Sequence, residues 1–294
     1  MGGLAGGDDL ARLFLLAALT MLAFAANSIL NRAALADGQT GPAAFAAIRT
    51  VSGAFCLAGI VYIRSGLPRL IAPGRWIGTG ALVVYMLGFS FAYIALDAGV
   101  GALILFGGVQ ITMFAGALLA GERPPAARWI GAIVAFSGLV WLLWPAGAAR
   151  PDVTAAVMMT LAALGWGVYS LAGKGATDAL GDTAANFTLA APFTLIVWLA
   201  LPDAATGRGI ALAMIAGAIT SGLGYALWYT LLPRIASSAA ALAQLTVPVI
   251  AMAGGALLLS EAPTLRLILA GIVVLGGVAY GVVGAQRTRS SSGS

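Results

Sequence analysis

The chain alternates between long apolar runs and short polar breaks, which is the pattern of successive membrane-spanning helices. A helix needs roughly 20 predominantly apolar residues to cross the hydrocarbon core of a bilayer. Charged residues, glycine and proline clusters and short polar segments separate the runs, and these breaks are too short to hold a soluble domain. The pattern predicts ten spans, near residues 13–31, 43–63, 76–95, 100–120, 127–144, 153–173, 185–201, 210–231, 237–258 and 265–284.

The amino-acid composition also indicates that lipid, rather than water, surrounds most of the chain. Of the 294 residues, 61% are hydrophobic and 9% are charged, and the mean hydropathy is +1.00. A soluble domain carries about 25% charged residues, so this chain has too little charge to cover a surface in water. The 40 glycines fit helices that pack closely in lipid through small side chains. We therefore predict an all-α integral membrane protein with ten transmembrane helices.

Two segments of the chain repeat each other. GALLAGERPPAARWIGA begins at Gly116, and its near copy GALLLSEAPTLRLILAG begins at Gly255. Earlier in each copy, Phe24 aligns with Trp166 at nearly the same spacing. Because each copy holds five spans, an odd number, the copies must cross the membrane in opposite directions, as in many secondary transporters. The predicted units are a first five-helix repeat over 1–145, a second, inverted five-helix repeat over 151–286 and a disordered tail over 287–294.

Positive charge predicts the orientation. Of the 15 Lys and Arg residues, ten fall on the side of the two termini, and five fall toward the other side: Arg32, Arg49, Arg150, Arg208 and Arg266. Because cytoplasmic loops carry an excess of Lys and Arg, both termini are expected in the cytoplasm.

The two copies also resemble a known family. The stretches 93–143 and 228–282, with GALLAGERPP and GALLLSEAPT at their centres, resemble the signature halves of the EamA-type drug/metabolite transporter superfamily. AFAAIRT (44–50) resembles the arginine motif of its second span. The likeness covers essentially the whole chain and is closest to exporters of aromatic amino acids. It implies a secondary transporter of a bacterial inner membrane that exports small amphipathic metabolites, amino acids including aromatic ones, by alternating access.

Glu122 and Glu261 are counterparts in the two copies, each at the end of a span. One interpretation is a helix-end acid, stabilised by about 0.3–1 kcal/mol at the N-terminus of the next helix. The other is direct contact with a substrate. We favour the structural interpretation, because the acid recurs where the five-span unit recurs.

Inverted-repeat transporters bind their substrates near the bilayer midplane, between the halves. Amide side chains there have several hydrogen-bonding groups to satisfy, and aromatic rings suit an amphipathic or aromatic solute. The side chains that combine mid-span depth with this chemistry are predicted to line a central substrate cavity: Asn27, Tyr85, Phe89, Gln110, Trp166, Tyr169, Tyr225 and Gln244. The alternatives are hydrogen bonds between helices for the amides and packing or an interfacial aromatic belt for the rings.

Charged groups inside the spans are scarce. Arg49 is the basic residue well inside a span, and it either pairs with a substrate carboxylate or serves the structure at the outer interface or between helices. The ten Asp and Glu residues fall in termini, loops or span ends, and the sequence holds no histidine. Proton-driven carriers commonly relay protons through a buried carboxylate or histidine, so passive facilitation is favoured over proton antiport.

No metal site, cofactor or catalytic centre is predicted, which disfavours a membrane enzyme. The expected partners are a small-molecule substrate, an amino acid or similar metabolite, and the lipid bilayer. Nucleic acid is not expected, and the chain is expected to be a monomer. The alternatives that stay open are an exporter of another small metabolite or drug and a channel-like facilitator.

Overall fold

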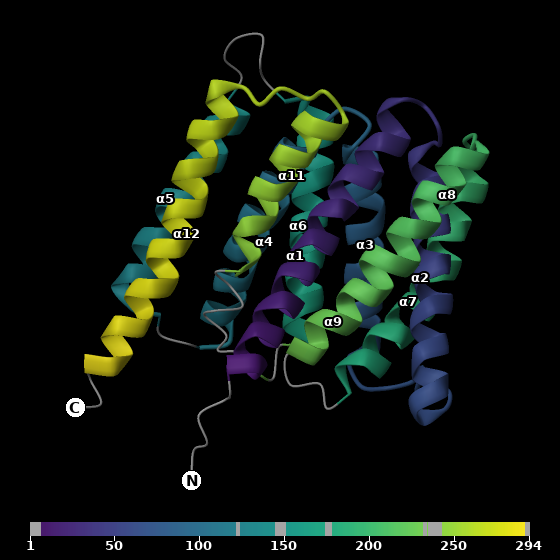
Figure 1. Ribbon diagram of the computed structural model, residues 1–294, viewed down its shortest axis with the longest axis horizontal. Coiled ribbons are helices and arrows are strands. Elements are labelled where there is room, and N and C mark those ends of the chain that lie inside the picture. The colour runs from purple at the N-terminus through teal and green to yellow at the C-terminus, as the bar shows by residue number, and fades with distance from the viewer. Residues whose placement is uncertain are drawn as a thin grey trace.

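The computed structural model describes residues 7–121, 124–144, 151–173, 178–231, 234 and 243–291, and its regular structure there is nearly all helical. The helices stand side by side in one tilted bundle (Figure 1). The beginning of α1 and the end of α12 lie at the same end of the bundle, as an even number of crossings requires. The predicted fold class, an all-helical multi-pass membrane protein, is confirmed.

The first half of the chain supplies five helices close to the predicted spans. Glycines bound two of these helices. Gly66 follows α2 with φ 87° and Gly74 precedes α3 with φ 72°, and both are backbone conformations that favour glycine. The helices are α1 (Gly7–Ala36), α2 (Pro42–Ser65), α3 (Arg75–Ala92), α4 (Ala98–Leu119) and α5 (Ala126–Leu143).

The second half begins its helices with side-chain caps. Asp152, Asp178 and Thr206 each accept a hydrogen bond from a backbone N–H three residues ahead. The helices are α6 (Val153–Ala172), α7 (Ala179–Ala200), α8 (Gly207–Ile215), the π-helical segment η1 (Ala216–Leu223), α9 (Gly224–Leu231), α11 (Thr246–Leu258) and α12 (Leu265–Ser291).

Within the described residues, nine helical segments are long and apolar enough to cross a membrane, with α8, η1 and most of α9 forming one of them. The expected span at 237–258 is represented by the shorter apolar helix α11, and residues 237–242 lie outside the described part. At the other boundary, α12 stays helical to Ser291 and therefore includes residues 287–291, which we had expected in the tail.

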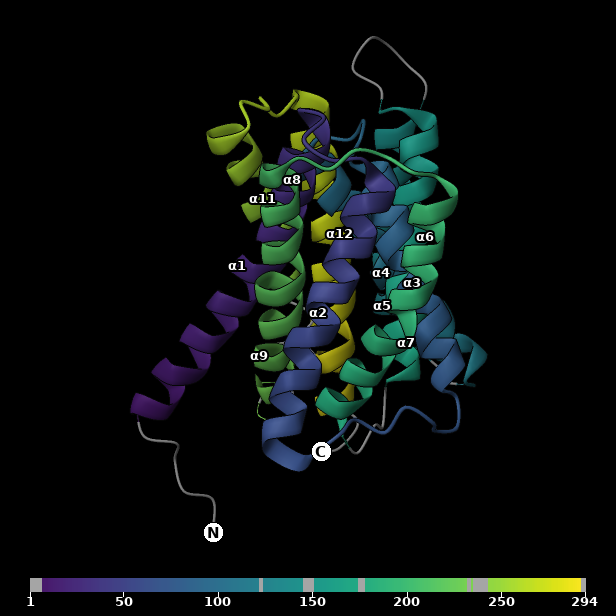
Figure 2. The same ribbon diagram turned by 90° about the vertical axis from the view of Figure 1, so that its right-hand side faces the viewer.

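Equivalent helices of the two halves make equivalent contacts, which is what the predicted inverted repeat leads us to expect. Helix α3 packs on α6 as α8 and η1 pack on α1, and α4 packs on α6 as α11 packs on α1. Helices α2, α4 and α5 each pack on their own counterparts, α7, α11 and α12. Figure 2 shows α2 standing between α8–α9 on one side and α7 on the other. The most extensive contacts join helices of different halves, so the two halves of the chain pack as one bundle.

Glycines let α3 and α6 approach closely. A Cβ on Gly165 would lie 2.7 Å from the Ala81 carbonyl oxygen and 2.8 Å from the Tyr85 nitrogen. On the facing helix, a Cβ on Gly88 would lie 2.6 Å from the Met158 carbonyl oxygen. Backbone therefore meets backbone at this crossing, as in other small-residue helix interfaces in membranes.

Gly165→Ala is expected to destabilise the protein by about 1–3 kcal/mol, because the added methyl group overlaps backbone atoms of α3. Gly80→Ala is the matched control, since no atom lies within 4 Å of the position that its Cβ would take. The control should be neutral or slightly stabilising, because alanine is the better helix former. Thermal unfolding of the purified variants measures the difference, and equal melting temperatures would contradict the close approach.

Candidate substrate site

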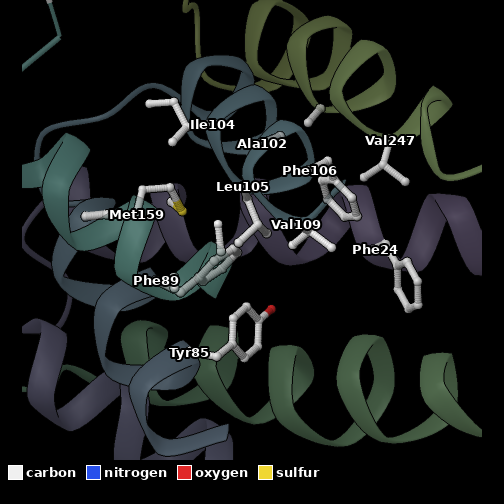
Figure 3. Close-up of a cluster of buried hydrophobic side chains, with 14 of the residues drawn as sticks. Phe24, Tyr85, Phe89, Ala102, Ile104, Leu105, Phe106, Val109, Met159 and Val247 are labelled. Atoms are coloured by element: carbon white, nitrogen blue, oxygen red, sulfur yellow. The ribbon is translucent and has the colours of Figure 1, made fainter. Parts of the chain in front are cut away.

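A cluster of aromatic rings lies at mid-span where α3 of the first half meets α6 of the second. The rings of Tyr85 and Phe89 have centroids 5.3 Å apart, and Tyr85 lies 4.9 Å from Trp166. Tyr85 and Phe89 are buried, and Figure 3 shows them in one apolar cluster with Leu105 and Val109 of α4.

Trp166 connects this pair to further rings of the second half. It stacks on Tyr169 at 5.5 Å with an interplanar angle of 28°, and it lies 4.9 Å from Tyr225 of α9. Tyr169 and Tyr225 are buried, and Trp166 is half-buried. Five of the predicted site residues thus form one continuous set of ring contacts drawn from three helices.

The cluster has an internal symmetry that the sequence repeat explains. Tyr225 contacts Phe24 of α1 edge to face, with ring centroids 5.8 Å apart. Phe24 is the repeat counterpart of Trp166, and the spacing from Tyr85 to Tyr225 lies between those of the two aligned pairs, Gly116 with Gly255 and Phe24 with Trp166. The Tyr225–Phe24 pair is therefore the inverted copy of the Tyr85–Trp166 pair.

The predicted site residues omitted several members of this cluster. Phe24 was missed although its alignment with Trp166 was the available signal. Trp228 lies 5.8 Å from Phe24, and Phe187 lies 5.9 Å from Tyr225. Phe187 comes from α7, and its sequence position carried no pattern that separated it from lipid-facing phenylalanines.

A buried polar chain runs alongside the rings. The Arg49 Nε donates to Ser221 Oγ at 3.2 Å, and Arg49 Nη2 donates to the Tyr85 hydroxyl at 3.0 Å. The Ser221 hydroxyl in turn donates to Asn27 Oδ1 at 3.4 Å, and the Thr220 hydroxyl lies 2.5 Å from the same oxygen. Asn27 is thus joined to Tyr85 through two intervening side chains, and both halves contribute.

The π-helical segment η1 supplies Thr220 and Ser221 to this chain. A π-helix shifts the register of the residues that follow, and such segments often occur at functional sites. The segment approaches α2 closely because Gly217 has no side chain: a Cβ there would overlap Ser52 Oγ and the Arg49 carbonyl oxygen. This contact brings Ser221 within reach of Arg49.

Gln110 and Gln244 are not joined to the cluster. Their side chains are half-buried and make no hydrogen bond with another residue that the structure describes. At mid-span the aromatic rings pack on one another, and whether a substrate separates them to occupy a cavity stays a prediction.

An ion pair joins the halves at the end of the bundle opposite the termini. Arg32 of α1 donates from Nε to Glu261 Oε1 at 2.6 Å, and Glu261 Oε2 accepts from the backbone N–H of Ala98 at 2.8 Å. Glu261 is therefore a helix-end acid, but the helix that it stabilises is α4 of the other half rather than α12, the next helix in the chain. Glu122, its repeat counterpart, lies outside the described residues.

A pocket of about 200 Å³ lies beside this ion pair, and Asp97, Asp152, Glu261 and Met252 are among its lining residues. The ring cluster is not part of it. Toward the other end, Arg75 of α3 pairs with Asp182 of α7 at 2.6 Å. Ion pairs between the halves thus flank the ring cluster on both sides.

Comparison with known proteins places the chain among transporters. Residues 153–282 match the EamA-like transporter family. The uncharacterized protein PA1977 of Pseudomonas aeruginosa is 46% identical over 270 residues, which cover 91% of this chain and 93% of that protein. An uncharacterized transporter of Archaeoglobus fulgidus is 24% identical over 216 residues, covering 71% and 76% of the two chains.

The fold is also found among solved structures. The crystal structure of a protein 21% identical in sequence superposes with a TM-score of 0.66, covering 95% of this chain and 99% of the other. The family match begins at the first residue of α6 and ends within α12, so it lies inside the region predicted as the second repeat. The chain therefore belongs to the same family as the Pseudomonas aeruginosa protein and is a multi-pass membrane transporter with an EamA-like domain in its second half.

Proposed function

We propose that the protein is a secondary transporter that exports small amphipathic metabolites, amino acids including aromatic ones, by alternating access. One observation carries the proposal: the mid-span cluster of Tyr85, Trp166, Tyr169 and Tyr225, to which both halves contribute. Aromatic walls bind apolar side chains by stacking and bind an amino group through cation–π contact. The resemblance to the aromatic amino acid exporter YddG, which is one of general sequence similarity, points to the same substrates.

Alternating access requires a site that either end of the protein can close. The ion pairs Arg32–Glu261 and Arg75–Asp182 join opposite halves on either side of the rings. In the proposed mechanism, one pair breaks to open its end of the protein while the other keeps the opposite end closed, and the central rings hold the substrate. The proposed setting is a bacterial inner membrane, with both termini in the cytoplasm and the protein acting as a monomer.

Transport is expected to run down the substrate gradient without an imposed proton gradient. In the described part of the chain, carboxylates lie at helix ends or in connections, away from the mid-span rings. A proton relay would need such a group near the substrate. Uptake of phenylalanine into proteoliposomes at equal pH on both sides measures this. Uptake that vanishes at equal pH and returns only with a pH step would contradict the prediction.

Counterflow in the same proteoliposomes tests the mechanism. Proteoliposomes preloaded with unlabelled phenylalanine should accumulate labelled phenylalanine transiently if the protein is a carrier. Unlabelled substrate then occupies the site when it turns back to the outside, so little of the label that has entered is carried out again. A channel-like facilitator only equilibrates the label. Equilibration without transient accumulation would therefore reject alternating access, and lack of any flux for amino acids would reject the substrate class.

A further inference from the structure

Arg49 carries a positive charge at the centre of the molecule. Arg49 lies in the second turn of α2, the helix that begins at Pro42, and its side chain is fully buried in the helix bundle. Among the described residues, no carboxylate forms an ion pair with its guanidinium. Arg32 and Arg75, by contrast, each pair with a carboxylate at 2.6 Å.

Within the described residues, the contacts of Arg49 are all to neutral groups. Nε and Nη2 donate to the hydroxyls of Ser221 and Tyr85, whereas Nη1 is buried and has no hydrogen-bond partner in that part of the chain. The guanidinium carbon lies 4.9 Å from the centre of the Phe89 ring and 5.3 Å from that of Tyr85. Hydroxyls and rings orient the cation, but they do not neutralise its charge.

A buried charge without a counter-ion is costly, and in membrane spans such residues mark ligand pathways. The missing group is a hydrogen-bond acceptor, because a guanidinium can only donate hydrogen bonds, and an anionic acceptor would also balance its charge. Its planar fork matches a carboxylate, and the free Nη1 leaves one side of the fork open.

The second half of the chain has no charged counterpart of Arg49. At the spacings of the aligned pairs Gly116 with Gly255 and Phe24 with Trp166, the counterpart of Arg49 falls within 188–191, TLAA, which holds no charge. The two halves therefore share their rings but not their cation. One anionic group per substrate molecule satisfies this site.

We infer that Arg49 is the anion-binding residue of the central site and that its ligand is the carboxylate of an amphipathic solute whose apolar part lies against Tyr85 and Trp166. This inference rests on the proposed function and narrows its substrate class. Monocarboxylates and zwitterionic amino acids bind, whereas the corresponding amides and purely cationic amines bind weakly.

Two isosteric probes test the inference without requiring transport. Binding of 3-phenylpropionate and of its uncharged amide, 3-phenylpropionamide, is measured by calorimetry on the purified full-length protein. The wild-type protein should bind the carboxylate at least about tenfold more tightly, because only the carboxylate forms a charge-assisted pair with Arg49. Equal affinity for the two probes in the wild-type protein overturns the inference, even if no Arg49 variant folds.

Variants then assign the preference to this residue. Arg49→Gln should bring the ratio of the two affinities to about one, and Arg49→Lys should retain part of the preference because it keeps the charge. Arg208→Gln, which removes an exposed arginine at the start of α8, is the control and should leave the ratio unchanged. A folded Arg49→Gln protein that keeps the wild-type ratio rejects the assignment.

The results distinguish the role of Arg49 from the proposed substrate class. If phenylalanine is transported while the amide binds as well as the carboxylate, only the role of Arg49 is rejected. If neither probe binds and phenylalanine is not transported, the aromatic substrate class itself is rejected, and the inference falls with it.

Discussion

Trp166→Ala is expected to reduce the affinity for phenylalanine about tenfold while changing that for threonine much less. The ring of Trp166 contacts those of Tyr85, Tyr169 and Tyr225, so its removal opens the centre of the cluster. Losing one aromatic contact costs about 0.5–1.5 kcal/mol, and about 1.4 kcal/mol corresponds to a tenfold change in affinity. Tyr85→Ala should shift the ratio of the two substrates in the same direction.

The competing explanation is that these rings only pack the core. It predicts lower expression and thermal stability with an unchanged ratio of phenylalanine to threonine transport, both normalised to folded protein. Trp129→Ala is the matched control, because Trp129 also makes a ring contact, with Phe114 at 5.1 Å, but outside the cluster. An unchanged ratio in both Trp166→Ala and Tyr85→Ala would remove these two residues from the substrate site.

Glu261→Gln is expected to destabilise the protein by about 2 kcal/mol. Removing one partner of a buried ion pair costs roughly 3–5 kcal/mol, and the side chains of Arg32 and Glu261 keep 16% and 12% of their exposure, which reduces the cost. The glutamine oxygen can still accept the hydrogen bond of Ala98, so the change tests the charge rather than the helix cap. The melting temperature of the purified variant measures the loss.

Asp97→Asn is the control, because it removes a nearby negative charge and leaves the Arg32–Glu261 ion pair in place. Asp97 contacts the same arginine at 3.4 Å but is 50% exposed, so its removal should cost under about 1 kcal/mol. If both variants lose the same stability, the Arg32–Glu261 bond has no special role in joining the halves. Substrate preference should stay unchanged in both, because neither residue belongs to the ring cluster.

Most helix positions could be predicted from the sequence, because the bilayer sets the length of an apolar span. The second span, predicted at 43–63, is Pro42–Ser65, and the sixth, predicted at 153–173, is Val153–Ala172. The prediction was less accurate where capping decides the boundary. Helix α7 begins at Ala179, ahead of the predicted start at 185, because Asp178 caps it and Asp182 lies in its first turn. Charge there marked a helix start rather than a loop.

The members of the ring cluster, our candidate site, could be predicted in part. Polar and aromatic side chains at mid-span are few, so choosing them by depth found five members of the ring cluster and Asn27. Depth alone could not separate these from Gln110 and Gln244, which have the same kind of position and do not join the cluster. Which face of a span points inward depends on the rotation of the helix, and the hydrophobic pattern of an all-apolar span does not encode that rotation.

The order of residues along the chain determined the all-helical membrane fold and the place of most spans, and it predicts an inverted repeat, because hydropathy and internal similarity are properties of the sequence itself. Only the tertiary structure decided which mid-span groups meet. Arg49 reaches Tyr85 across 36 residues, and Ser221 reaches Asn27 across 194 residues. These contacts follow from helix crossings set by close backbone packing, such as that of Gly165 on α3 and of Gly217 on α2. The sequence left the role of Arg49 open for the same reason: that no described carboxylate pairs with it depends on which distant helices surround it.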